Sequence, residues 1–357
     1  MKILTIVGAR PQFVKAAALS REFTKYDNIE EIIVHTGQHF DDNMSEVFFR
    51  EMEIPKPKYN LAIHSVGHGA MTGRMLEGIE KILIDEKPDL LLVYGDTNST
   101  LAGALAAKKL HIKVAHVEAG LRSFNMEMPE EINRILTDRI SDYLFCPTQT
   151  AVDNVMKEGY QNIDCKIINS GDVMQDAANF YTLTSEKKAT ISKTIDLTNF
   201  ILCTLHRAEN TDDPKRLSAI VAALNEINLT TTVILPLHPR TKKIIADLGL
   251  TLNFNTISPV GYFDMIELLK NCKIVMTDSG GLQKEAFFFK KNCVTMRDQT
   301  EWVELIGNGL NLLVGADTEK IINGTKEMLA KKGNFDVNLY GNGTACKNIV
   351  NELLTSF

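Results

Sequence analysis

Short runs of apolar residues alternate with longer stretches of mixed polarity along the whole chain. Each run is rich in Ile, Leu and Val, as expected of strands that are buried on both faces. The runs that stand out span residues 2–7, 30–36, 89–95, 113–119, 143–147, 165–169, 200–206, 232–238, 273–278 and 292–296. Most stretches between them, such as 101–111 and 216–227, repeat apolar residues with a spacing of about 3.6, as helices do. Strands separated by helices predict parallel sheets made of βαβ units.

The alternation is interrupted once, between residues 170 and 194. This stretch favours a helix that becomes increasingly polar, and a new alternation begins at Phe200. We therefore predict an α/β protein with two doubly wound, Rossmann-like domains, residues 1–170 and 171–343, that face each other across a cleft. Residues 344–357 have the apolar spacing of a short amphipathic helix. Ligands of such sheets bind beyond the carboxyl ends of the strands, so residues that follow strands are the candidates for a site.

The composition narrows the classes of function. The 357 residues are 44% hydrophobic and 24% charged, which is typical of a soluble protein of about two domains. The net charge of −6 provides no general basic field, so we expect neither a nucleic acid nor a membrane surface as a partner. The apolar runs are too short to cross a bilayer, and the first residues read as a strand rather than a signal peptide. A cytoplasmic protein is predicted.

The cysteines are expected to be reduced residues, mostly in the core. They form no CxxC pair and have no spacing suited to zinc, and several lie inside apolar runs. The six are Cys146, Cys165, Cys203, Cys272, Cys293 and Cys346. No metal site is therefore predicted.

The turn after the first strand, GARPQFVK, combines a glycine with two cations. Gly8 leads into the start of a helix, where backbone N–H groups favour an anion. Arg10 and Lys15 add positive charge suited to a pyrophosphate. The turn matches neither GxGxxG nor GxxxxGK[ST], and a plain turn with solvated charges is the alternative.

Carboxylates follow two further strands. Asp96 could cap the next helix, but the residues behind it include better placed candidates, which leaves Asp96 for another role. Glu118 ends the run at 113–119, and Glu130 and Glu131 open a helix. Capping explains Glu130 or Glu131 but does not explain Glu118. Carboxylates on adjacent strand-end loops would repel one another, and this environment suits general acid–base chemistry.

In the second half, Ser279-Gly280-Gly281 forms a turn from a strand into a helix. Glycines there expose N–H groups and let a ligand approach the backbone closely. Glu285 lies one helical turn further on, where it could bind a ribose diol. Ser279 as a helix N-cap would explain the turn but not Glu285.

His206 and Arg207 stand together after the strand-like run at 200–206. A histidine and an arginine at a strand exit suit a phosphate or a developing negative charge. The pattern as a whole indicates a nucleotide–sugar enzyme that works by proton transfer. It provides cations for a diphosphate, an acceptor for ribose and an acidic cluster.

The motifs GARPQFVK, GDTNST, HVEAGLRS, PEEINR, HRAEN, HPR, TDSGGLQKEA and RDQTEW follow one another along nearly the whole chain. Their set and order resemble the non-hydrolysing UDP-N-acetylglucosamine 2-epimerases. The resemblance implies the fold of the GT-B glycosyltransferases, with the C-terminal helix packed back on the first domain, and usually a homodimer. It implies a UDP-N-acetyl amino sugar as substrate, with no metal and no nicotinamide cofactor.

The resemblance also implies a mechanism. The C2 proton is removed while UDP leaves from C1, which gives a 2-acetamidoglucal, and UDP then returns while C2 is reprotonated from the other face. By matching positions, Asp96, Glu118 and Glu130 are the acid–base carboxylates, and His206 supports the departing diphosphate. The matching contacts to UDP and sugar are Arg10, Lys15, Arg207, Ser279, Gly280, Gly281, Glu285 and Arg297.

Some positions depart from the family pattern. Relatives regulated by a second UDP-N-acetylglucosamine carry QHREMLDQ-like and HRREN stretches, whereas this chain has Gln38-His39-Phe40-Asp41-Asp42, His68 and Ala208 at the corresponding places. Allosteric activation is therefore not expected. The stretches TGQHFDDNMSEVFF and RDQTEWVE are more similar to relatives that epimerise UDP-2,3-diacetamido-2,3-dideoxyglucuronate for surface polysaccharides, and the Arg10-Pro11-Gln12-Phe13 stretch argues against the hydrolysing sister group.

Two other classes of function fit parts of the pattern. A GT-B glycosyltransferase would use the same Ser-Gly-Gly turn and Glu285, but it would need an acceptor and has no need of three carboxylates on the other domain. A silent nucleotide-sugar binding protein would have no reason to keep Asp96, Glu118, Glu130 and His206 together.

Overall fold

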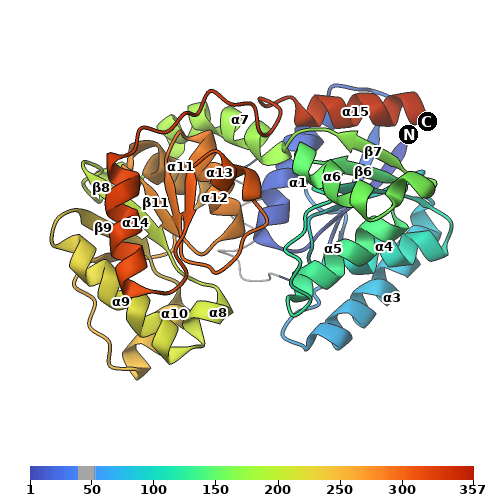
Figure 1. The fold of residues 1–357 in the computed structure, drawn as a ribbon. Helices are drawn as coiled ribbons and strands as arrows, with labels where there is room; N and C mark the ends of the chain where they lie inside the picture. Colours follow the sequence, from blue (N-terminus) through green and yellow to red (C-terminus); the bar gives the residue numbers. More distant parts are fainter. Residues whose placement is uncertain (39–51, 53) are drawn as a thin grey trace. The chain divides into compact units, whose positions relative to one another are not determined.

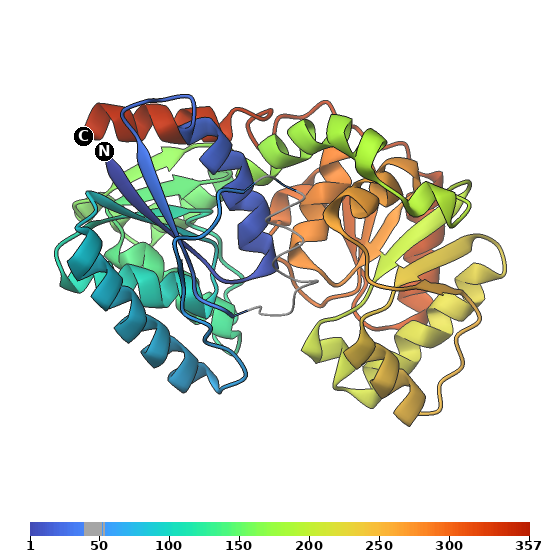
Figure 2. The same cartoon turned by 180° about the vertical axis from the view of Figure 1, so that it is seen from behind.

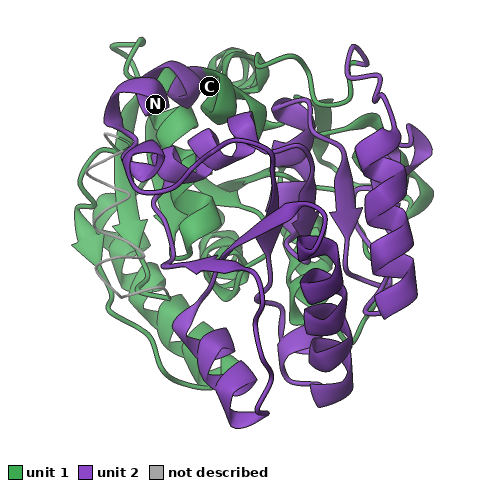
Figure 3. Ribbon diagram, turned by 90° about the vertical axis from the view of Figure 1, so that its left-hand side faces the viewer, with its two compact units in different colours: residues 1–179, 338–357 green, residues 180–337 purple. Residues whose placement is uncertain are grey.

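The computed structural model describes residues 1–38, 52 and 54–357. They form two compact units, drawn in separate colours in Figure 3. Unit 1 comprises residues 1–179 and 338–357, and unit 2 comprises residues 180–337. Each unit is built on one parallel sheet, so the predicted α/β class with two doubly wound halves is confirmed.

Unit 1 has seven described strands in the order β3-β2-β1-β4-β5-β6-β7, all paired in parallel (Figure 1). The strands are β1 (Lys2–Val7), β2 (Glu30–His35), β3 (Tyr59–Asn60), β4 (Leu90–Tyr94), β5 (Lys113–Val117), β6 (Tyr143–Cys146) and β7 (Lys166–Asn169). The helices are α1 (Arg10–Phe23), α3 (His68–Glu86), α4 (Asn98–Lys109), α5 (Pro129–Ile140), α6 (Gln149–Lys157), α7 (Val173–Lys188), which continues into unit 2, and α15 (Ala345–Ser356).

The pleat of the strands sends alternate side chains to opposite faces of this sheet. Leu4 and Ile6 of β1 and Val93 of β4 share one core with Met75 and Ile79 of α3, and alanines of α4 complete it. On the other face α1 packs on β1, β2 and β4 and against α15, as Figures 1 and 2 show. Helices on both faces explain why the strands read as continuous apolar runs.

The last helix is fastened to unit 1 at its first turn. Asp176 of α7 accepts hydrogen bonds from the backbone N–H groups of Ala345 and Cys346, at 3.1 and 2.9 Å. The first N–H groups of a helix have no partner inside it, and a carboxylate satisfies both these donors and the helix dipole. Lys166 of β7 adds an ion pair with Glu352 at 2.8 Å. Residues 344–357, expected to be a short helix, therefore belong to unit 1.

Unit 2 has six described strands in the order β10-β9-β8-β11-β12-β13, again all parallel. The strands are β8 (Phe200–Thr204), β9 (Thr232–Pro236), β10 (Asn255–Ile257), β11 (Val275–Thr277), β12 (Cys293–Thr295) and β13 (Asn311–Leu313). The helices are α8 (Ala208–Thr211), α9 (Pro214–Asn228), α10 (Pro239–Asp247), α11 (Tyr262–Asn271), α12 (Gly280–Phe288), α13 (Val303–Gly307) and α14 (Thr318–Ala330).

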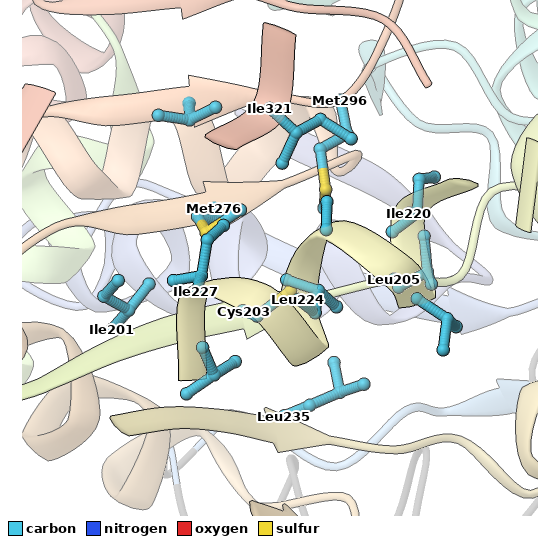
Figure 4. Packing of buried hydrophobic residues seen from close by; sticks show 14 of the residues in the cluster. Ile201, Cys203, Leu205, Ile220, Leu224, Ile227, Leu235, Met276, Met296 and Ile321 are labelled. Carbon is cyan, nitrogen blue, oxygen red and sulfur yellow. The ribbon is translucent and has the colours of Figure 1, made fainter. Parts of the chain in front are cut away.

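The core of unit 2 has the same layered plan. On one face Ile201 and Leu235 of the central strands pack with Ile220 and Leu224 of α9 and with Ile321 of α14 (Figure 4). On the other face, side chains of α11 and α12 form a second core with the alternate residues of the same strands. Helices therefore cover both faces of each sheet, and the strand ends are the places where functional residues can lie.

All ten strands expected from the apolar runs are present. The sequence did not reveal β3, β10 and β13, each only two or three residues long and each at the edge of its sheet. An edge strand is paired on one side only and needs no long apolar run, so such short elements leave little trace in the pattern.

Glu31 in β2 is a carboxylate whose ionisation opposes folding. Burial raises its pKa to about 7, and hydrogen bonds with Ser20 and Thr5 oppose this only in part. Because the unfolded chain releases this proton near pH 4.5, the folded state binds more protons between about pH 4.5 and 7, and stability falls as the pH rises through that window. Glu31→Gln should therefore be more stable than the natural chain at pH 8, by about 2 kcal/mol, and about equal to it near pH 4.

Urea unfolding at the two pH values measures this difference. Glu30→Gln is the matched control, because Glu30 is the exposed neighbour on the same strand. A gain that is the same at both pH values in Glu31→Gln would contradict the assignment.

Candidate active site

The strand order reverses inside each sheet, and the predicted site residues follow the strands beside these points. In unit 1, β1 lies between β2 and β4, and in unit 2, β8 lies between β9 and β11. Ligands of open α/β sheets bind at the carboxyl ends of the strands next to such a reversal. The turns after β1, β4 and β5 and the turns after β8 and β11 are therefore where a site is expected.

The turn after β1 is fastened to the end of β4. Gln12 Oε1 accepts hydrogen bonds from the backbone N–H groups of Gly8 and Ala9, at 2.8 and 3.0 Å, and its Nε2 donates to the carbonyl of Tyr94 at 2.9 Å. A Cβ on Gly8 would collide with the hydroxyl of Thr36, so only glycine fits there. The sequence analysis did not assign this bridging role to Gln12.

Lys15 and Glu118 form an ion pair at the carboxyl end of this sheet. Lys15 Nζ, in the second turn of α1, donates to Oε2 of Glu118, and each side chain is 9% exposed. Gly95 borders the pair, because a Cβ there would lie 3.3 Å from both of these atoms. Glu118 has a φ of 71°, a left-handed conformation that non-glycine residues adopt infrequently. The ion pair with Lys15 holds its side chain in place.

Asp96 is held by two side chains of α5. Its carboxylate pairs with Nη2 of Arg134, whose Nη1 is 2.5 Å from Oε2 of Glu131. Asn133 Nδ2 donates to the backbone carbonyl of Asp96 at 2.9 Å. The side chain of Asp96 is 30% exposed, whereas that of Glu131 is 0% exposed. Asp96 can therefore reach a ligand while Arg134 holds its orientation.

Glu131 orders the loop between β5 and α5. Its Oε2 accepts hydrogen bonds from the backbone N–H and the hydroxyl of Ser123, both at 2.9 Å, and its Oε1 accepts from the backbone N–H of Phe124 at 2.9 Å. Apart from Arg134, the donors to Glu131 belong to the preceding loop, so this side chain does not cap the backbone of α5, although Glu131 lies in the first turn of that helix. Glu130, its neighbour in the first turn of α5, is half-buried, as is Arg10 at the start of α1.

The structure places a cation beside two of the acids. Glu118 lies against Lys15, and Asp96 shares Arg134 with Glu131. The spacing of motifs could not show this, because Arg134 reaches Asp96 from a helix that is distant in sequence. Lys15 was expected to bind a pyrophosphate, and in the structure its ammonium group lies next to the carboxylate of Glu118.

In unit 2, Asp278 organises the turn after β8. This 0% exposed carboxylate accepts hydrogen bonds from the backbone N–H groups of His206 and Arg207, at 3.1 and 2.9 Å. The ring of His206 lies with Nδ1 3.4 Å from Oδ1 of Asp278 and is 52% exposed. Asp278 thereby fixes the backbone that presents the side chains of His206 and Arg207, which were expected to meet a diphosphate.

The two glycines at the start of α12 differ in the space around their Cβ positions. A Cβ on Gly280 would collide with Oε1 of Glu301, whereas a Cβ on Gly281 would meet nothing within 4 Å. Ser279 holds the N-cap position, but within the described residues its hydroxyl makes no capping hydrogen bond to the helix. Capping therefore does not explain the side chain of Ser279, and the N–H groups beside Gly281 border open space.

Arg297 is a buried cation beside this helix start. It is 1% exposed, with Nη1 3.0 Å from Oε2 of Glu301 and Nε 3.8 Å from Oε1 of Glu209. Glu285, in the second turn of α12, is also buried, with 8% of its surface exposed. Glu209 and Glu301 were not assigned roles, although the motifs HRAEN and RDQTEW contain them.

Four of the positions that depart from the family pattern lie outside the described residues. They are His39, Phe40, Asp41 and Asp42. Gln38 accepts a hydrogen bond from the hydroxyl of Ser99 at 2.9 Å. His68 Nδ1 and Asn98 Nδ2 share a hydrogen bond of 3.1 Å. Both partners belong to the first turn of α4, so these two positions are tied to the element that follows Asp96.

Three further observations concern the chain as far as it is described. All six cysteines are free, and five of them are buried. The described residues contain no group of three or more His, Cys, Asp and Glu side chains that could hold a metal ion. In the same part of the chain, every helix is too short or too polar to cross a membrane.

Comparison with known proteins identifies the family. A family model described as UDP-N-acetylglucosamine 2-epimerase matches residues 21–354. The chain belongs to this family. The match includes every described strand except β1 and every strand-end turn described above except the turn after β1, and it confirms the resemblance drawn from the motifs.

Individual relatives match over their full length. The chain is 58% identical to a UDP-2,3-diacetamido-2,3-dideoxy-D-glucuronate 2-epimerase of Pseudomonas aeruginosa, over 99% of each protein. It is 46% identical to a UDP-N-acetylglucosamine 2-epimerase of Methanocaldococcus jannaschii, over 98% of each. The epimerase is therefore a nucleotide-sugar 2-epimerase, an isomerase that acts on carbohydrates.

Solved structures of the family share the fold. The crystal structure of the Methanocaldococcus jannaschii UDP-GlcNAc 2-epimerase in complex with UDP-GlcNAc and UDP has a TM-score of 0.93 at 45% identity, and the match covers 99% of this chain and 100% of that one. The Neisseria meningitidis enzyme bound to UDP-GlcNAc has a TM-score of 0.89 at 34% identity, with 99% and 100% covered. The predicted GT-B type of fold is confirmed.

Proposed function

We propose that this epimerase acts on UDP-2,3-diacetamido-2,3-dideoxyglucuronate and serves the synthesis of a surface polysaccharide. The observation that carries this substrate is the 58% identity, over 99% of both proteins, with the Pseudomonas aeruginosa enzyme named for that sugar. The second candidate is the conversion of UDP-N-acetylglucosamine to UDP-N-acetylmannosamine. It is supported by the family description and by 46% identity with the Methanocaldococcus jannaschii enzyme.

We infer that the reaction proceeds by elimination and re-addition. A base takes the C2 proton, the C2–H electron pair forms the C1=C2 bond, and the C1–O bond breaks with its electrons on the diphosphate oxygen. The same oxygen then attacks C1 while a proton is delivered to the other face of C2, which inverts that centre. Two faces of one ring require acid–base groups in two different places.

The arrangement in unit 1 supports this mechanism. Glu118 beside Lys15 and Asp96 beside Arg134 are two carboxylates with separate surroundings at the carboxyl end of one sheet. Glu130, in the first turn of α5, is the third carboxylate that we assign to proton transfer or to handling of the glucal. The cation next to each of the first two holds the carboxylate in place.

The UDP moiety is proposed to bind the residues around the start of α12. The backbone N–H groups at the start of α12 and the side chains of His206 and Arg207 after β8 suit a diphosphate. The buried carboxylate of Glu285, in the second turn of α12, suits the ribose hydroxyl groups. His206 stabilises the diphosphate as it departs. The residues that we assign to UDP and sugar binding are Arg10, Lys15, Arg207, Ser279, Gly280, Gly281, Glu285 and Arg297.

Gly281→Ala should weaken UDP binding without changing stability. The new methyl group meets no atom within 4 Å in the free protein, so the melting temperature should stay the same. It would, however, stand where a phosphate must approach the helix backbone, and we expect the Kd for UDP to rise about tenfold or more. Calorimetric titration with UDP measures this, and Gly307→Ala is the control, because that glycine also has open space around its Cβ position.

Transfer of deuterium tests the proposed reaction. Each UDP-sugar is incubated with the epimerase in deuterated water without any acceptor, and deuterium at C2 is followed by NMR and mass spectrometry. We expect C2 labelling and the 2-epimer, with a higher kcat/KM for the diacetamido uronate. Labelling of UDP-N-acetylglucosamine alone would assign the second candidate, and no C2 label from either sugar would exclude both.

We also propose a homodimer in the cytoplasm. Ile132 and Leu136 lie one turn apart on α5 and are 40% and 47% exposed, and an exposed apolar face of this kind suits contact with a second copy. The free cysteines fit a reducing compartment. Sedimentation equilibrium measures the assembly, and a monomer at micromolar concentration would contradict the dimer.

A further inference from the structure

His116 is a fully buried histidine that uses both ring nitrogens. It lies in β5, two residues before Glu118, and is 0% exposed. Its Nε2 is 2.7 Å from the backbone carbonyl oxygen of Gly95, and its Nδ1 is 2.7 Å from Oδ1 of Asp138 in α5. The strand-end motif drew attention to Glu118, and it left His116 without a role.

These partners determine where the protons are. A carbonyl oxygen only accepts, so Nε2 carries a proton that it donates to Gly95. Burial by itself would raise the pKa of Asp138, but the hydrogen bonds and charges of His116 and Arg122 outweigh burial and leave that pKa below its ordinary value. Asp138 is therefore a carboxylate that also only accepts, and Nδ1 must donate to it. Both ring nitrogens thus lie against acceptors, and the proton on each nitrogen is assigned from these partners.

The charges around this ring are balanced in pairs. Asp138 also accepts hydrogen bonds from Nη1 of Arg122, at 2.7 Å, and from the backbone N–H of Gly120, at 3.1 Å. Arg122 in turn pairs with Glu158 at 2.7 Å. His116, Asp138 and Arg122 are thus buried members of one network whose outer end, Glu158, reaches the surface, and such a network is stable only when every buried member has its partners.

The network ends on the two turns that carry the acids. Gly95, which accepts from His116, directly precedes Asp96, and its Cβ position is 3.3 Å from Oε2 of Glu118. Gly120, which donates to Asp138, follows Glu118 by two residues. Gly95, in the turn after β4, has a φ of 61°. Glu118 and Gly120, in the turn after β5, have φ values of 71° and 78°, so both turns contain left-handed residues that hydrogen bonds hold in place.

We propose that His116 is a positioning residue for the epimerisation. Its ring, anchored by Asp138, fixes the carbonyl of Gly95 and thereby the relative placement of Asp96 and Glu118 at the carboxyl end of the sheet. The inference rests on the proton-transfer roles proposed for those two acids. A displacement of about 1 Å in a reacting group can lower a rate about a hundredfold, so loss of this anchor should act on kcat rather than on binding.

Two variants separate the hydrogen bonds of the ring. The amide of His116→Gln lies near the position of Nε2 and can still donate to Gly95, whereas the amide of His116→Asn lies near Nδ1 and can donate only to Asp138. We expect His116→Asn to lower kcat about a hundredfold, with KM and the Kd for UDP within about threefold of the natural enzyme. His116→Gln should recover kcat to within about tenfold of the natural enzyme.

A measurement on the natural protein keeps the inference testable if a variant does not fold. With histidines labelled in ¹⁵N, the ring signals of His116, assigned by their absence in either variant, should show two protonated nitrogens. A single protonated nitrogen, an unchanged kcat in both variants, or an equal loss in two folded variants would overturn the positioning role. These outcomes are distinct from failure of the acid–base assignment, which would appear as undiminished turnover of Glu118→Gln.

Discussion

Glu118→Gln should lower kcat about a thousandfold while UDP still binds, since a positioned acid or base contributes about 10²–10⁴ in rate. Glutamine keeps the size of the side chain and can accept a hydrogen bond from Lys15, which now donates to the carboxylate. An amide cannot take up or return a proton at neutral pH, so the elimination and the re-addition should both slow. Turnover assays give kcat, and calorimetry should give a Kd for UDP within about threefold of the natural enzyme.

The matched control is Glu127→Gln. Glu127 lies on the loop between β5 and α5, and its side chain is exposed, so its loss should leave kcat unchanged. If Glu118→Gln turned over substrate as fast as this control, Glu118 would have no part in proton transfer and the role of base would pass to another carboxylate.

Glu131→Ala should destabilise unit 1 by about 3 kcal/mol, the usual effect of removing one partner of a buried ion pair. Its carboxylate is 0% exposed, accepts two hydrogen bonds from Ser123 and one from Phe124, and pairs with Arg134. Without it the N–H groups of the loop lose their acceptors and Arg134 keeps only Asp96. We therefore expect a lower kcat as well, because the ion pair that orients Asp96 is no longer supported on its other side.

Chemical denaturation measures the loss of stability, with Glu127→Ala as the exposed counterpart, for which we expect a change below about 0.5 kcal/mol. Glu131→Gln should fall between the two, because its amide oxygen still accepts one of the loop hydrogen bonds. Equal stability of Glu131→Ala and Glu127→Ala would show that the loop does not depend on the buried carboxylate.

The fold was largely readable from the chain. Strands covered by helices on both faces must be apolar on both faces, so ten strands appear as apolar runs. The edge strands β3, β10 and β13 were missed, because an edge strand of two or three residues needs no such run. The family could be recognised for a related reason, since its motifs lie at strand ends in a fixed order along the chain.

The site was readable only in part. Asp96, Glu118 and His206 could be selected because polar residues directly after buried strands have few structural reasons to be there. Their partners could not be selected: Arg134 reaches Asp96 from α5, and Lys15 reaches Glu118 from α1. Motif spacing contains no information on which side chain of a helix faces which strand end, so the cations beside the two acids could not be predicted.

Local sequence therefore determined which elements form, which faces they bury and which residues stand at the strand ends. Only the packing of α1 and α5 against the sheet decided which cations lie beside the acids and how the acids are held, through Lys15, Arg134 and the buried Glu131. The reason is physical: apolar periodicity is a property of neighbouring residues, whereas an ion pair or a buried hydrogen bond joins residues that the folded backbone brings together from distant parts of the chain.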